Sequence, residues 1–131
     1  MTRLLLVCFL IVDLGFIAYW VITLVEVVPP RFLFKDYDNP ILQAWNWSFL
    51  PLDLLVSATG LTAVYRSRSG HSWKQWALLS LALTSCSGLQ AIAFWAIRAD
   101  INFWWWAPNL FLLFYPLPFV WRIVNDMRNP C

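Results

Sequence analysis

Two carboxylates lie inside long apolar stretches of this sequence, and they are the side chains best suited to chemistry there. Asp13 and Asp53 each stand near the middle of an apolar run. A charge at the centre of a bilayer costs roughly 2.5–3.5 kcal/mol on insertion scales, so such acids usually face the protein interior and serve a function. Two neighbouring carboxylates cannot both be ionised easily, which suits proton-coupled work or general-acid chemistry. Asp13 and Asp53 are therefore the candidate proton-carrying acids, and neither is assigned as catalytic. The alternative for each is a structural aspartate that is hydrogen-bonded to a hydroxyl or a backbone group.

Polar and aromatic side chains recur at helical spacing around these acids. Asn46, Phe49, Asp53 and Ser57 follow steps of three and four residues, which places them on one helix face. Trp20 falls seven residues after Asp13, so these two residues also share a face. The candidate ligand-binding residues are Trp20, Asn46, Trp47, Phe49, Ser57, Gln90, Trp95 and Asn109.

The elements that must position these residues are long apolar runs. The sequence predicts helices over about residues 4–28, 41–65, 73–97 and 103–124. The chain is 61% hydrophobic and 12% charged, whereas an average soluble domain has about 25% charged residues. A run of about 20 apolar residues spans the hydrocarbon core. We therefore expect an all-α fold, an antiparallel bundle of four transmembrane helices that forms one domain over residues 1–131. Pro116 and Pro118 are expected to break the last helix near its end.

Lysine and arginine are more frequent on one predicted side of the membrane. The terminal segments and the middle loop share a side if the chain crosses four times, and they hold Arg3, Arg66, Arg68, Lys74, Arg122 and Arg128. The opposite side holds only Arg31, Lys35 and Arg98. By the positive-inside rule both termini are predicted to be cytoplasmic, in a multi-pass protein of the cell membrane. Glu26 also falls on the outer side, where it either pairs with Arg98 or stays solvated.

Tryptophan is abundant, with ten residues in the chain, and seven of them fall in the predicted outer half. Tryptophan normally collects at membrane interfaces. The outer cluster is therefore either a heavy interfacial belt or the wall of an aromatic pocket.

Several function classes lack their signals. A net charge of +2 with no basic stripe gives no reason to expect a nucleic-acid partner. The single histidine, His71, lies in the middle loop, and no histidine, cysteine and carboxylate cluster has metal-ligand spacing. The sequence also has no glycine-rich phosphate loop and no ligand set for haem or an iron–sulfur cluster. We therefore expect neither a metal nor a cofactor.

Three stretches together resemble a known family. They are FKDYDNPILQAWNWSFLPLDLL, SGLQAIAFWAIRAD and WWWAPNLFLLFYPL. They are similar to the YvaD-like family of small bacterial membrane proteins, and the similarity extends over nearly the whole chain. The resemblance implies four spans and a bacterial setting, and it implies no activity and no functional residues.

Three hypotheses about function follow from the residues. The first is binding or transport of a lipophilic or cationic small molecule, in which a homodimer could complete the path. The second is a non-catalytic subunit that contacts a partner in the membrane through its tryptophans and small residues. The third is a membrane enzyme, an isomerase or terpene-type cyclase, in which an aspartic acid protonates a lipophilic substrate. The chain is not assigned as an enzyme.

Overall fold

The described part of the computed structural model, residues 1–128, is entirely helical apart from its loops. The helices are α1 (Arg3–Val25), the short 3-10 helix η1 (Pro30–Phe32), α2 (Pro40–Trp47), α3 (Leu50–Arg68), α4 (Lys74–Ile97), α5 (Phe103–Phe114) and α6 (Pro116–Arg128). Four helical segments are long and apolar enough to cross a bilayer: Arg3–Val25, Pro40–Arg68, Lys74–Ile97 and Phe103–Arg128. The predicted all-α fold is confirmed. Residues 129–131 of the predicted domain lie outside the described part.

Prolines divide two of these segments. Proline has no backbone N–H and clashes with the preceding turn, so it weakens the helix on its N-terminal side. The turn at Ser48 and Phe49 separates α2 from α3 just before Pro51. Tyr115 separates α5 from α6 just before Pro116, which is the break that the sequence predicts.

The first helix is shorter than predicted. It ends at Val25, because Glu26 takes a left-handed backbone conformation with φ 54°. A residue before proline is pushed out of the helical region, so the Pro29-Pro30 pair prevents the chain from resuming the helix before it. The predicted extension to Val28 is therefore part of the following loop.

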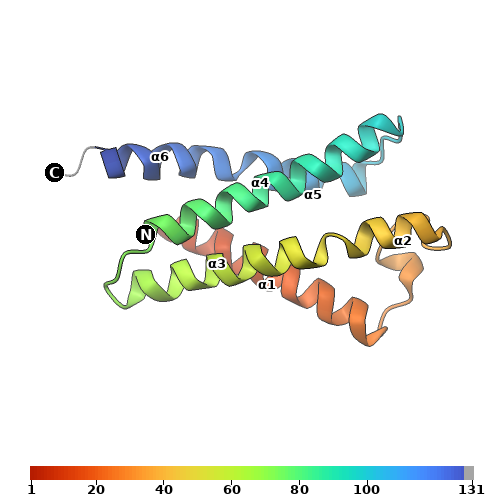
Figure 1. Ribbon diagram of the computed structural model, residues 1–131, viewed down its shortest axis with the longest axis horizontal. Helices are drawn as coiled ribbons and strands as arrows, with labels where there is room; N and C mark the ends of the chain where they lie inside the picture. Colours follow the sequence, from red (N-terminus) through yellow and green to blue (C-terminus); the bar gives the residue numbers. More distant parts are fainter. Residues whose placement is uncertain (129–131) are drawn as a thin grey trace.

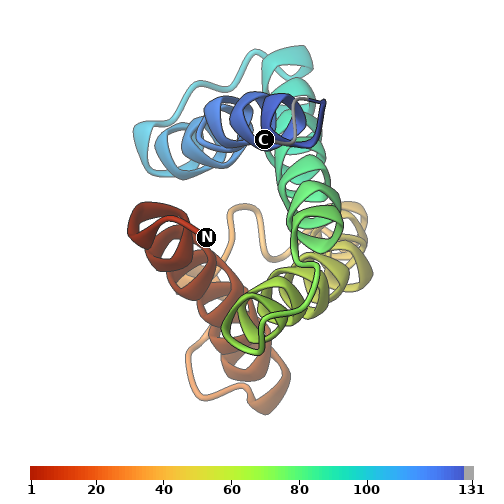
Figure 2. The ribbon, with the colours of Figure 1, turned by 90° about the vertical axis from the view of Figure 1, so that its left-hand side faces the viewer.

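The long segments are arranged in an open arc (Figure 2). α3 packs between α1 and α4, and α4 in turn packs against α5 and α6. The start of α1, the end of α6 and the α3–α4 loop lie at one end of the molecule, which we call the terminal end (Figure 1). The α1–α2 loop and the α4–α5 link lie at the opposite end, which we call the far end (Figure 1).

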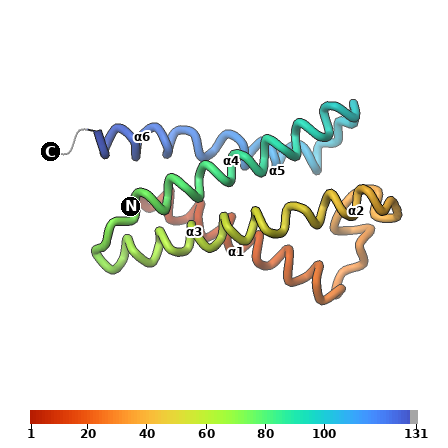
Figure 3. Tube along the Cα trace, in the orientation of Figure 1, coloured from red at the N-terminus to blue at the C-terminus, as the bar shows by residue number. Residues whose placement is uncertain are grey.

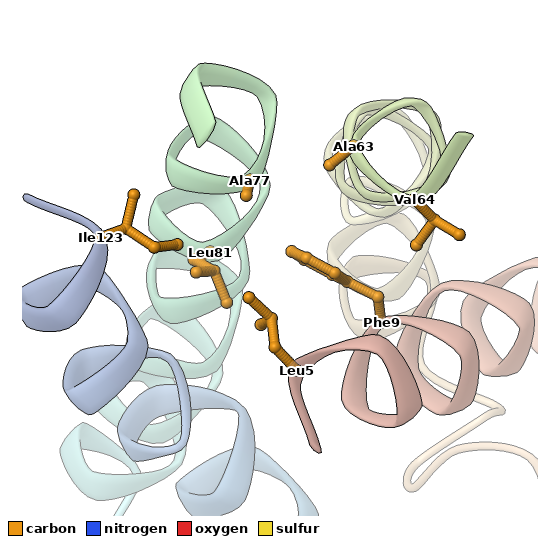
Figure 4. Close-up of a cluster of buried hydrophobic side chains, with 7 residues drawn as sticks. All are labelled: Leu5, Phe9, Ala63, Val64, Ala77, Leu81 and Ile123. Atoms are coloured by element: carbon orange, nitrogen blue, oxygen red, sulfur yellow. The ribbon is translucent and has the colours of Figure 1, made fainter. Parts of the chain in front are cut away.

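In the terminal half, an apolar core joins the two ends of this arc, α1 and the last segment. Phe9 of α1 extends toward Ala63 of α3 and Ala77 of α4 (Figure 4). Leu81 of α4 lies between Leu5 of α1 and Ile123 of α6, so α1 and the last segment join the same cluster (Figure 4). Toward the far end α1 and the last segment draw apart (Figure 3). The fold is thus packed at the terminal end and opens toward the far end.

Candidate functional site

The far half of the molecule holds a cavity of about 300 Å³. All of the long helical segments contribute to its wall, including Trp20 of α1, Asn46 of α2, Asp53 of α3, Trp95 of α4 and Asn109 of α5. Ligand pockets in proteins commonly have volumes of roughly 300–1,000 Å³, with mostly apolar walls and a few placed polar groups. The cavity therefore has the size and the lining of a site for a small organic molecule.

Asp53 is the acidic group of this cavity. It is 5% exposed, and its carboxylate joins three helices. Oδ2 accepts a hydrogen bond from Trp20 Nε1 at 2.9 Å, and Oδ1 accepts one from Ser87 Oγ at 3.1 Å. Asp53 also lies in the first turn of α3, where the aligned peptide dipoles favour a negative group. The break after α2 creates this helix start, so the proline in the sequence helps to build the site.

Asn46 contributes a neutral polar group nearer the far end. Its side chain is 9% exposed, and its Oδ1 accepts a hydrogen bond from the Tyr19 hydroxyl at 3.2 Å. Its Nδ2 is buried and has no hydrogen-bond partner among residues 1–128. On the facing helix Asn109 donates from Nδ2 to the backbone oxygen of Trp105 at 2.6 Å.

Aromatic rings form most of the remaining wall. Trp45 meets Trp95 edge to face, with ring centroids 5.7 Å apart. The rings of Trp95 and Trp105 are nearly parallel, with centroids 6.5 Å apart. Ring faces attract cations, most strongly for tryptophan. Together with Asp53, these rings give the cavity features that suit an organic cation.

Comparison with known proteins places this chain in a family. Residues 5–129 match the model of a family of unknown function, DUF5360. The chain belongs to the DUF5360 family. The uncharacterized protein YvaD of Bacillus subtilis (strain 168) is 46% identical to it over 122 residues, which cover 92% of each chain. The resemblance to the YvaD-like family is thereby confirmed. No solved structure matches this DUF5360 member.

Two ion pairs hold the loops at the far end of this family member together. Lys35 pairs with Asp100, and the Arg98 guanidinium lies 3.5 Å from the Asp36 carboxylate. Each pair joins the α1–α2 loop to the α4–α5 link. The Lys35 ammonium also lies 5.5 Å from the ring centroid of Trp95, so this loop is fixed beside the cavity wall.

Of the two alternatives for Glu26, the ion pair with Arg98 does not form among residues 1–128, and the Glu26 side chain is exposed. Glu26 ends α1 in a left-handed conformation, and the loop beyond it brings Asp36 to Arg98 instead. The sequence placed both residues at the same surface but could not fix the path of that loop.

Asp13 is buried outside the cavity wall. It is 0% exposed, and its backbone oxygen accepts a hydrogen bond from Ser57 Oγ at 3.0 Å. Its carboxylate contacts Gly60 and fills the space that a Cβ atom at Gly60 would occupy. Neither carboxylate oxygen has a hydrogen-bond partner in the described part of the chain.

The two acids point in opposite directions because their helices are antiparallel. Side chains in a helix tilt toward its N-terminus. Asp13 on α1 is therefore directed toward the terminal end, and Asp53 on α3 toward the far end. Gly60, which Asp13 contacts, lies seven residues beyond Asp53 in sequence, or about 10 Å along α3. The carboxylates thus occupy separate places, and only Asp53 lines the cavity.

The structure brings part of the predicted ligand-binding set together. Trp20, Asn46, Phe49, Trp95 and Asn109 line the cavity. The others lie elsewhere: Ser57 is bonded to the backbone of Asp13, Trp47 packs on Trp20 with ring centroids 5.5 Å apart, and Gln90 is exposed.

Sequence reasoning missed several residues of the wall. Phe16 and Tyr19 precede Trp20 by four residues and one residue, so a stripe read from Trp20 along α1 could have found Phe16. Ser87 had a signal too, because it stands at helical spacing with the small residues Ser80, Thr84 and Ala91, but small residues at this spacing predict only close helix packing. Trp104 and Trp105 of α5 belong to the outer-half tryptophans that the sequence offers as a belt or a pocket wall, but three adjacent tryptophans leave open which of them line the cavity.

Metal ligands are not gathered at the cavity. Within residues 1–128 no group of three or more histidine, cysteine or carboxylate side chains could hold a metal ion.

Proposed function

We propose that this chain is an integral membrane protein that binds a small lipophilic cation in the far-half cavity, as a receptor or as the binding step of transport. The membrane setting is supported by the four helical segments of spanning length. The excess of lysine and arginine at the terminal end supports a cytoplasmic location for both termini.

The observation that carries the proposal is Asp53 in an aromatic-walled cavity between all the long helical segments. A carboxylate in a low-dielectric site attracts a cation much more strongly than it would in water. Tryptophan faces can replace part of the water that a quaternary ammonium group loses on entry. A lipophilic cation can therefore interact with both the Asp53 carboxylate and the tryptophan rings, whereas a neutral molecule of the same shape can interact only with the rings.

All four long helical segments of one copy line the cavity, which supports cation binding by a single chain. The homodimer considered from the sequence stays a prediction. A cavity with a central carboxylate also favours binding over the role of a purely structural partner subunit.

The proposal is tested with two probes of nearly equal shape. Benzyltrimethylammonium carries a positive nitrogen where the hydrocarbon neopentylbenzene carries a carbon. We expect saturable binding of radiolabelled benzyltrimethylammonium to the protein in nanodiscs, measured by equilibrium dialysis against empty nanodiscs. Unlabelled cation should displace the label at least tenfold more effectively than neopentylbenzene, because only the cation interacts with the Asp53 charge. Equal displacement by both probes, or no saturable binding, would contradict the proposal.

A further inference from the structure

Asn46 lines the cavity and carries a buried hydrogen-bond donor that no group of residues 1–128 uses. The Tyr19 hydroxyl donates to Oδ1 of Asn46 at 3.2 Å, which leaves Nδ2 as the free end of the amide. The Nδ2 group of this cavity-lining residue is buried and has no partner among residues 1–128. Buried polar groups are nearly always hydrogen-bonded, and an unpaired donor is unfavourable. The arrangement therefore favours a ligand that supplies an acceptor at this position.

Two adjacent residues of α1 contact Asn46 and Asp53. Tyr19 bonds to Asn46, and its neighbour Trp20 bonds to Asp53. Asn46 and Asp53 are seven residues apart in sequence, so a donor and a carboxylate are separated by about 10 Å along the α2–α3 segment. The carboxylate is the deeper of the two, and the donor lies toward the far end.

We infer that Asn46 determines ligand specificity by donating a hydrogen bond to an uncharged oxygen acceptor at the opposite end of the ligand from its cation. The inference rests on the proposed function, since the cationic end is placed by Asp53. The ligand class is an elongated apolar cation with a carbonyl, ether or hydroxyl oxygen about 10 Å from the nitrogen. The aromatic wall accommodates the apolar chain between the two polar ends.

A series of synthetic cations tests this inference. The parent probe is nonyltrimethylammonium, and each ketone probe carries one keto group, moved one carbon at a time along the nonyl chain. In the wild-type protein we expect one or two adjacent ketone positions to bind about fivefold more tightly than the parent, since a neutral hydrogen bond has a net effect of that size. The readout is the ratio of ketone affinity to parent affinity, measured by displacement of labelled benzyltrimethylammonium in nanodiscs.

Two variants show whether Asn46 is the donor. Asn46→Leu keeps the side-chain size but removes the amide, and the affinity ratio should fall to about one or lower, because nothing then replaces the water lost by the ketone. Asn46→Ala also removes the donor and cannot supply another, so it should abolish the ketone advantage too. Because the ratio compares two cations on one variant, a general change in fold or charge cancels from it.

The outcomes separate this inference from the proposed function. If no ketone exceeds the parent in the wild-type protein, or if the advantage persists in both variants, the inference is overturned while cation binding stands. If the parent and every ketone fail to bind, both fall. If the ketone advantage depends on Asn46 but parent binding does not depend on Asp53, the role of Asn46 is supported and the cation site is overturned.

Discussion

Replacing Asp53 by asparagine should weaken benzyltrimethylammonium binding by at least tenfold. The substitution removes the negative charge but retains a carbonyl oxygen able to accept from Trp20 Nε1, so the shape of the wall is preserved. A tenfold loss corresponds to about 1.4 kcal/mol, a modest value for an ion pair shielded from water. Equilibrium dialysis of the labelled probe, with the variant and wild-type proteins in the same nanodiscs, gives the ratio directly.

Asp13→Asn is the matched control for this experiment. It makes the same chemical change in the other buried acid, which lies outside the cavity wall against Gly60. We expect cation affinity to change by less than about twofold in this variant, since charge attraction weakens with distance and Asp13 is directed away from the site. Equal losses in the two variants would mean that Asp53 acts on the fold rather than on the ligand.

Gly88→Ala should be the most destabilising single change at the interface of α4 and α5. A Cβ atom at Gly88 would lie 2.6 Å from the backbone oxygen of Asn109 and 2.6 Å from the backbone nitrogen of Leu113. Backbone atoms cannot swing aside, so the helices would have to move apart. Overpacking of this kind typically costs about 1–3 kcal/mol. The midpoint of SDS unfolding, followed by near-UV circular dichroism of the tryptophans, should fall accordingly.

Gly15→Ala provides the control for the loss of a helical glycine. Apart from the neighbouring backbone of α1 itself, no atom of residues 1–128 lies within 4 Å of a Cβ built at Gly15, on an exposed face of α1. Alanine is favoured over glycine in a helix by roughly 0.5–1 kcal/mol, so this variant should unfold at the same or a higher SDS concentration than the wild type. If Gly88→Ala unfolded together with Gly15→Ala, the close contact between α4 and α5 would be refuted.

The large elements of this fold could be predicted because they depend on local properties of the sequence. Apolar runs of spanning length give the long helical segments, and Pro116 gives the break in the last one. The end of α1 was placed three residues too far, because apolar character continues to Val28 while the backbone turns at Glu26. Hydrophobicity therefore predicts where the helical segments lie, but it predicts less accurately the residue at which a helix ends and the chain turns back.

The candidate site could be predicted only in part because it depends on the register between helices. The common face of Asn46, Phe49 and Asp53 follows from helical spacing, and these residues do line the cavity. The same spacing places Ser57 on that face, yet Ser57 lies closer to the terminal end and donates a hydrogen bond to the backbone oxygen of Asp13. The contact between Trp20 and Asp53 requires knowing how α1 is shifted along α3, and a single sequence does not contain this shift.

The separation of the two acids is the part of the site that sequence reasoning could not reach. Both carboxylates were expected near the middle of adjacent antiparallel helices. The tilt of side chains toward the helix N-terminus then moves them in opposite directions, and Gly60 provides the space that receives Asp13. Only Asp53 lines the cavity, so the two acids do not form the neighbouring pair considered from the sequence.

The most direct test of a cation site at Asp53 is a crystal structure with para-bromobenzyltrimethylammonium, located by the anomalous signal of its bromine. We expect a bromine peak inside the cavity, with the trimethylammonium group next to the Asp53 carboxylate and the ring against the tryptophan wall. A bromine peak found only on the outer surface of the helices, with the cavity closed or filled by side chains, would contradict it.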